Sequence, residues 1–347
     1  MQPLPDPRCR RIGLAGAASL LVLLVTALAL AETSPAGLRG PAFSDPDDRL
    51  AMPEDWVARP IAYEPWDAGA DLVINMDQDI YHTLWPQITR FGREHHLAIH
   101  LQEGTCSIAA GMLAKKTADM GGFCCPAGQE DRLPGLRFHT VGIVGIAFIV
   151  HPENPVEDVS ADQLRRIFQG RIQRWSELTT PAGAKGPDWP IKLITRLHCP
   201  KRPGHWRLLL DHKGQFAATA FEVGSIPDMV GEVARSRNAI GWEVLTMVER
   251  NRKKYPPVRP LAIGGLRPND SRALATLRYP FYRTYTITTW DGPGVANARA
   301  GQLAAFIVED FARLDPDQYG LVASRWLREA GWRFHGEELV GEPAETP

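Results

Sequence analysis

The stretch LAIHLQEGTCSIAAGMLAKKTADMGGF, residues 97–123, is typical of one strand–turn–helix–strand unit. Residues 97–101 alternate as a half-buried β-strand does. Residues 103–107 include side chains that favour the start of a helix, and we expect that helix over 108–117. A second short strand is expected at 120–123. Strands that alternate with helices along the chain indicate the α/β class.

The segments on either side repeat this alternation. A short β-like run at 71–74 precedes a helix over 81–95, whose apolar residues recur at spacings of four and three. Residues 141–150 are nearly all apolar, as in a strand that is covered on both faces. We therefore expect an α/β fold with largely parallel sheets, in which ligands bind at the carboxyl ends of the strands. The loops expected at those ends are 75–79, 104–107, 123–126 and 196–205.

The length and composition exclude several classes of protein. With 347 residues, the chain suits one large or two medium-sized domains. Its hydrophobic content of 44% and charged content of 23% exclude a disordered chain, a collagen and a multi-span membrane protein. A net charge of -1 gives no reason to expect a nucleic-acid surface. Five cysteines are too few for a disulfide scaffold of this length.

The N-terminus has the pattern of an export signal. Three arginines among residues 8–11 precede an apolar run over 12–31 that ends in Ala-Leu-Ala. This pattern predicts a signal peptide over 1–31 and a periplasmic protein. A retained N-terminal anchor is the alternative, because about 20 apolar residues can cross a bilayer. Residues 32–65 are rich in Pro, Asp and Ala, which predicts a linker or a loosely packed arm.

Five segments, in their order along the chain, carry a family resemblance. They are HHLAIHLQEGTCS (95–107), ADMGGFCCP (118–126), IVHPENPVEDVSADQLRRIFQGRIQRWSEL (149–178), AIGW (239–242) and RYPFYRTYTITT (278–289). Together they resemble the periplasmic solute-binding proteins. They are most similar to the phosphate-binding proteins of phosphate ABC importers.

The resemblance implies a two-lobed, type II-like α/β binding-protein fold with the ligand in the cleft between the lobes. The first lobe is expected at 66–147 and 275–335, the second at 148–274, and a tail at 336–347. The implied function is capture of a small molecule or ion for an ABC permease or a sensor protein. It also implies a monomer without enzymatic activity, which contacts the membrane only through its signal peptide or its partner.

The resemblance also implies where a ligand would bind. Counting from Asp119, the serine in the family's first loop after the second strand falls on Cys106, and the aspartate of the strand-end loop 18 residues later falls on Cys124. The hydroxyl position of the family's first loop falls near Asp77 and Gln78. A thiol is a poor hydrogen-bond donor, and a nearby carboxylate would repel an oxyanion, so we expect a ligand other than plain phosphate. The expected ligand-binding residues are Asp77, Gln78, Cys106, Ser107, Cys124, Arg196, Gly204 and His205.

The four cysteines beyond the predicted signal peptide leave two interpretations open. Thiols and imidazoles favour a soft metal or a metalloid, which would be the only cofactor-like group expected. The residues of such a site would be Cys106, Cys124, Cys199, His198 and His205. An oxidising compartment instead permits disulfides. The cysteines available for them are Cys106, Cys124, Cys125 and Cys199.

A thiol-based enzyme is a third alternative. A cysteine beside His198 or His205 could form a nucleophile pair. The spacing supplies no third residue to orient the histidine, and the chain has no C-x-x-C motif of the thioredoxin type. The binding-protein interpretation therefore remains the leading one.

Overall fold

The structure is a computed structural model that describes residues 43–344, apart from 180–182, 198–207, 212 and 255–256. The predicted signal peptide over 1–31 lies outside the described residues, as does the alternative of an anchor in the same segment. Within the described part of the chain, no helix combines the length and the apolar character needed to cross a bilayer.

Strands and helices alternate along the chain, as expected for the α/β class. The strands are β1 (Leu72–Asp77), β2 (Ile99–Gly104), β3 (Met120–Phe123), β4 (Leu136–Val150), β5 (Asp158–Val159), β6 (Lys192–Thr195), β7 (Phe221–Glu222), β8 (Ala239–Val244), β9 (Arg259–Pro260), β10 (Ala262–Ile263), β11 (Tyr282–Trp290), β12 (Leu321–Ala323), β13 (Arg333–His335) and β14 (Glu338–Gly341). The helices are α2 (Glu54–Ala58), α3 (Gln78–Glu94), α4 (Cys106–Lys115), α5 (Ala161–Phe168), α6 (Ile226–Arg235), α7 (Leu245–Asn251), α8 (Ser271–Ala275), α9 (Ala298–Phe311), α10 (Pro316–Tyr319) and α11 (Ser324–Glu329).

Among the described residues, ten strands form one mixed sheet. Its main order is β2-β1-β3-β11-β4-β8-β6-β7, and β9 and β12 also pair with β4. The pairs at both ends of this order are parallel, whereas β11 and β4 pair antiparallel with each other and with their other neighbours. The predicted α/β class is confirmed. The expectation of largely parallel sheets is wrong at the centre, because β11 returns from late in the chain to lie between β3 and β4.

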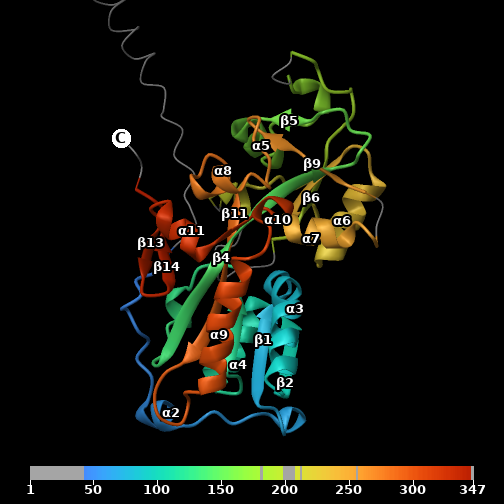
Figure 1. Cartoon of the computed structure of the whole chain (residues 1–347). Helices are drawn as coiled ribbons and strands as arrows, with labels where there is room; N and C mark the ends of the chain where they lie inside the picture. The colour runs from blue at the N-terminus through green and yellow to red at the C-terminus, as the bar shows by residue number, and fades with distance from the viewer. Residues whose placement is uncertain (1–42, 180–182, 198–207, 212, 255–256, 345–347) are drawn as a thin grey trace, which may run out of the picture. The chain divides into compact units, whose positions relative to one another are not determined.

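Strand β4 links the two groups of parallel strands (Figure 1). Its first part pairs with β11, and its last five residues pair with β8. Successive side chains of a strand point to opposite faces, so β4 contributes to two separate hydrophobic clusters. Phe148 and Val150 belong to the larger cluster, and Ala147 and Ile149 to the smaller one beside α6. The nearly uninterrupted apolar run at 141–150 is explained by burial on both faces.

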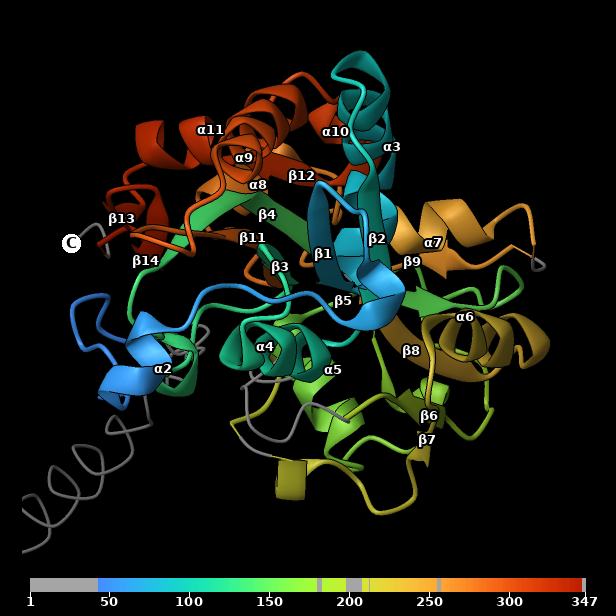
Figure 2. The same cartoon turned by 90° about the horizontal axis from the view of Figure 1, so that it is seen from below.

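Helices cover both faces of the parallel strands β1 to β3. Figure 2 shows α3 and α9 on one side of these strands and α4 on the other. Helix α4 begins at Cys106, two residues before the predicted start, because the Thr105 hydroxyl accepts a hydrogen bond from the backbone N–H of Ile108 at 3.3 Å. Strand β1 likewise runs on to Asp77, beyond the predicted end at residue 74. As a result, Asp77 is the last residue of β1 and Cys106 is the first residue of α4, and both lie at the same edge of the sheet.

The described part of the predicted arm packs against the sheet. Trp56 on α2 is 7% exposed, and its indole Nε1 donates to the carbonyl of Ala114 at 2.7 Å. The Trp56 ring lies 6.2 Å from that of Trp290, and the Lys116 ammonium sits 4.4 Å from the ring centre. Trp56 therefore joins the segment before β1 to α4 and β11 by both apolar contact and a cation–π interaction.

Candidate functional site

Three parallel strands end at one edge of the sheet. Strand β1 lies between β2 and β3, and its register places Asp77 opposite Gly104. Gly122 lies opposite the residue before Asp77. The three strand ends are therefore level. Two residues beyond these glycines come Cys106 and Cys124, so both cysteines lie at the same edge of the sheet as Asp77.

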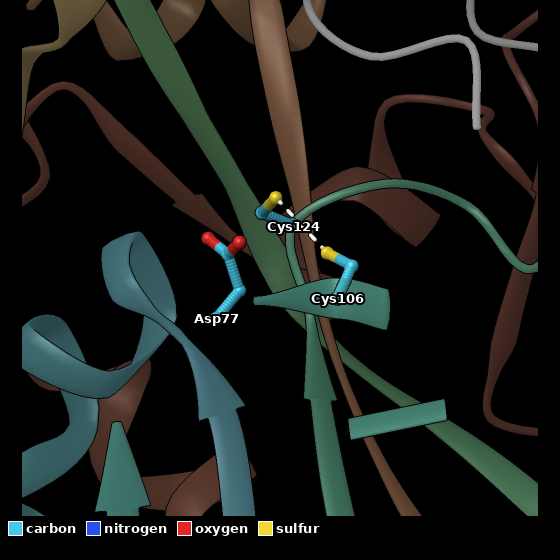
Figure 3. Close-up of side chains that lie close together, drawn as sticks. All are labelled: Asp77, Cys106 and Cys124. Atoms are coloured by element: carbon cyan, nitrogen blue, oxygen red, sulfur yellow. Dashed lines mark hydrogen bonds between the residues drawn. The ribbon is translucent and has the colours of Figure 1, made fainter. Parts of the chain in front are cut away.

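The side chains of Asp77, Cys106 and Cys124 meet at this edge (Figure 3). One carboxylate oxygen and the two sulfurs all lie within 4.8 Å of one another. The two Sγ atoms are 3.4 Å apart, which exceeds the roughly 2.05 Å of an S–S bond. They are thus two thiols in contact in this structure. The three residues are 8%, 4% and 1% exposed, so the cluster is closed to bulk solvent.

Asp77 is both a helix cap and a perturbed acid. Its carboxylate accepts a hydrogen bond from the N–H of Asp79 at 3.1 Å and so caps α3. Burial raises the pKa of Asp77 to about 7, and negative charge on Cys106 adds to the rise. The guanidinium groups of Arg283 and Arg196 oppose it. A carboxyl group that titrates near neutral pH in a buried cluster is typical of a functional site.

Cys124 is held as a thiol in the absence of a ligand. Its hydrogen bond with Cys106 raises the pKa of the Cys124 thiol, and a second hydrogen bond with Cys125 and burial raise it further. The negative charge of Asp77 acts in the same direction. A thiolate here would therefore need a positive group, such as a metal ion, to stabilise it.

Two arginines from other strands face this cluster, and each is paired with a carboxylate. Arg196 follows β6, and its Nη2 lies 2.8 Å from Oε2 of Glu243 on β8. Arg283 on β11 forms an ion pair with Asp79. Burial alone would lower the pKa of Arg196, but the charges of Glu243 and Asp77 outweigh it and raise that pKa. Burial raises the pKa of Glu243 and lowers that of Arg283.

The charges of these side chains do not suit a simple anion site. The two guanidinium groups are matched by Asp79 and Glu243, so Asp77 is a third carboxylate beside two positive charges. The N-terminus of α3, which could bind an anion, is already capped by Asp77. The cluster can instead coordinate a cation through sulfur and oxygen, or its two thiols can be oxidised to a disulfide.

The structure brings four of the expected ligand residues together. Asp77, Cys106 and Cys124 are in one cluster, and the charge of Arg196 acts on Asp77. Gln78 is partly buried at the first position of α3, whereas Ser107 is exposed on α4. Four expected residues lie outside the described part of the chain, and they are His198, Cys199, Gly204 and His205.

Three charged residues of the site were missed by the sequence reasoning. Asp79, Glu243 and Arg283 are each buried. Glu243 directly follows the AIGW segment, and Arg283 lies within the RYPFYRTYTITT segment. For Glu243 and Arg283 the available signal was a charged residue inside a run typical of a β-strand, because such a residue requires a partner when the strand is buried on both faces.

Solved structures support the fold. The chain is similar to an ABC-type phosphate transport receptor from Vibrio cholerae, with 20% identity, 72% of this chain and 99% of that chain covered, and a TM-score of 0.56. It is also similar to a putative phosphate ABC transporter substrate-binding protein with bound phosphate from Clostridium perfringens. That match has 17% identity, covers 73% of this chain and 98% of the other, and has a TM-score of 0.60.

Sequence comparisons point to the same family. The phosphate-binding protein PstS of Bacillus subtilis (strain 168) is 28% identical over 161 residues, which are 46% of this chain and 49% of PstS. The match thus spans about half the length of that relative. A family model described as a PBP superfamily domain matches residues 64–310. This match covers most of the chain, so the chain belongs to the PBP superfamily, as the resemblance in its sequence indicated.

Proposed function

We propose that this chain is an exported substrate-binding protein that captures a small ligand and delivers it to an ABC permease or a sensor protein. The observation that carries the proposal is the meeting of Asp77, Cys106 and Cys124 at one sheet edge, beside Arg196. These are the positions at which the resembling family places its ligand residues. Matched proteins described as binding proteins and transport receptors favour binding over catalysis.

The ligand we propose is not plain phosphate. Both buried arginines near the cluster are paired with carboxylates, and Asp77 adds a further negative charge when it is ionised. A phosphate dianion would have to displace those carboxylates or be buried against them, and either costs free energy. Hydrogen bonds from thiols are too weak to offset that cost.

The location and the domain arrangement belong to the same proposal. The basic, then apolar N-terminus supports export to the periplasm. We assign 66–147 and 275–335 to one lobe and 148–274 to the other. The change of partner along β4, from β11 to β8, supports a boundary near residue 148. Lobe closure around a ligand in a monomer is the motion we expect.

The proposal predicts a ligand-dependent change in the purified mature chain, residues 32–347. We expect at least one member of a panel of oxyanions and metal ions to change tryptophan emission and to reduce the radius of gyration in small-angle scattering. Inorganic phosphate should do neither. The response should be lost in an Asp77→Asn/Cys106→Ser variant and kept in Asp162→Asn, which alters an exposed carboxylate on α5.

Two results would contradict different parts of this proposal. A panel without any effect on emission or compactness would remove the support for solute binding. Saturable binding of phosphate to the unmodified protein would leave solute binding intact and overturn the ligand assignment.

A further inference from the structure

We propose that Asp77, Cys106 and Cys124 form a coordination site for a thiophilic metal ion, Zn²⁺ or Cu⁺, and this inference rests on the proposed binding function. The three side chains come from the ends of three adjacent strands and face one another (Figure 3). No side-chain rearrangement between distant elements is needed to bring the ligand atoms together, since they already lie within 4.8 Å.

The spacing of the ligand atoms suits a single ion. At a metal–sulfur distance of about 2.3 Å and tetrahedral angles, two sulfurs lie about 3.8 Å apart, and a sulfur and a carboxylate oxygen about 3.6 Å apart. The observed sulfur–sulfur distance is 3.4 Å, and the whole set spans at most 4.8 Å. Small side-chain movements are therefore enough to place all three atoms around one ion.

The donor atoms select the class of metal. Two thiols and one carboxylate match Zn²⁺, which accepts sulfur and oxygen ligands, and the thiols match Cu⁺. Mg²⁺ and Ca²⁺ prefer shells made of oxygen and would be poorly served by two sulfurs. Three protein ligands also leave a fourth tetrahedral position open for a water molecule or another ligand.

The surrounding charges favour a cation over an anion. Asp77, Asp79 and Glu243 carry three negative charges when ionised, whereas Arg196 and Arg283 carry two positive ones. Each guanidinium group pairs with a carboxylate that does not belong to the proposed ligand set. A cation bound here would offset the negative charge of the ionised cluster, whereas an anion would add to it.

The test is metal titration of the reduced mature protein under anaerobic conditions. We expect one equivalent of Zn²⁺ or Cu⁺ to bind in competition with a chromophoric chelator. Co²⁺, used as a spectroscopic probe of a zinc-type site, should give a thiolate-to-metal charge-transfer band. The Cys106→Ser/Cys124→Ser variant should bind at least about 100-fold more weakly, and Asp77→Asn about 10-fold more weakly.

A neighbouring cysteine supplies the matched control. Cys125 is buried next to Cys124 but is outside the ligand set, so Cys125→Ser should keep the stoichiometry and the charge-transfer band. The band in the unmodified protein reports thiolate ligation directly, which keeps the test valid if the double variant does not fold.

Absence of metal binding to the reduced protein, or binding that survives in Cys106→Ser/Cys124→Ser, would overturn the metal site. So would a Cys106–Cys124 disulfide found by mass mapping of protein isolated from the periplasm. If a non-metal member of the panel still changes tryptophan emission, the binding function stands and only the metal assignment fails.

Discussion

Replacing Asp77 with asparagine is expected to stabilise the metal-free protein by about 4 kcal/mol at pH 8 and to have little effect below pH 4. Asparagine has nearly the same shape and can accept the same capping hydrogen bond from the N–H of Asp79. It removes the ability to ionise and replaces one carboxyl oxygen with an amide NH2 group. The effect is large because burial raises the pKa of Asp77 from 3.8 to about 7.

The direction follows from the protons bound in each state. Below pH 3.8 the carboxyl group of Asp77 is protonated in both the folded and the unfolded chain. As the pH rises from about 4 to about 7, the unfolded chain releases this proton and the folded chain keeps it, so the folded state loses stability. Above the folded pKa both states are ionised, and the loss stays constant.

Denaturant unfolding of both proteins from pH 4 to pH 8, with a chelator present, measures this difference. Asp162→Asn, an exposed substitution on α5, is the control and should follow the wild-type curve. Parallel curves for wild type and Asp77→Asn over this range would show that Asp77 ionises normally. In that case the electrostatic description of the site would be wrong.

Replacing Arg132 with methionine is expected to lower the free energy of unfolding by about 3–5 kcal/mol. Arg132 is 1% exposed, and its two terminal nitrogens donate to the Glu338 carboxylate at 2.8 and 3.1 Å. Its Nε donates to the Ser44 hydroxyl at 2.8 Å, and Nη2 to the Ser44 carbonyl at 2.9 Å. The substitution leaves the buried Glu338 carboxylate without its partner. It also removes the hydrogen bonds that join Arg132 to Ser44 near the start of the described chain and to β14 near its end.

Two further variants test whether the loss comes from burying an unpaired charge. One removes an exposed arginine, and the other removes both partners of the buried pair. Arg137 on β4 pairs with Asp291, but these side chains are 64% and 56% exposed, so Arg137→Met should cost less than about 1 kcal/mol. The Arg132→Met/Glu338→Leu variant should recover part of the loss, because it no longer buries an unpaired charge. A loss below about 1 kcal/mol for Arg132→Met in thermal or denaturant unfolding would show that the pair does not hold these segments.

The sequence was sufficient for the local elements and for the family. The strand predicted at 120–123 has the same bounds as β3, and the alternation of strands and helices indicated the α/β class. These properties depend on residues that are close in the chain, such as the capping threonine before Cys106. The resemblance then singled out Cys106 and Cys124, because spacing from a shared motif needs no three-dimensional information.

Only the tertiary structure decided what surrounds the two cysteines. Glu243 and Arg283 come from strands far along the chain, and the mixed sheet order places them beside residues near position 80 or 196. Which arginine pairs with which carboxylate depends on burial and strand register. Neither property is encoded in a short window of sequence. The sequence by itself therefore determined the fold class and two sulfurs at expected ligand positions. The tertiary structure placed Asp77 against those sulfurs and paired both arginines with carboxylates, since only packing decides which distant charges share one desolvated space.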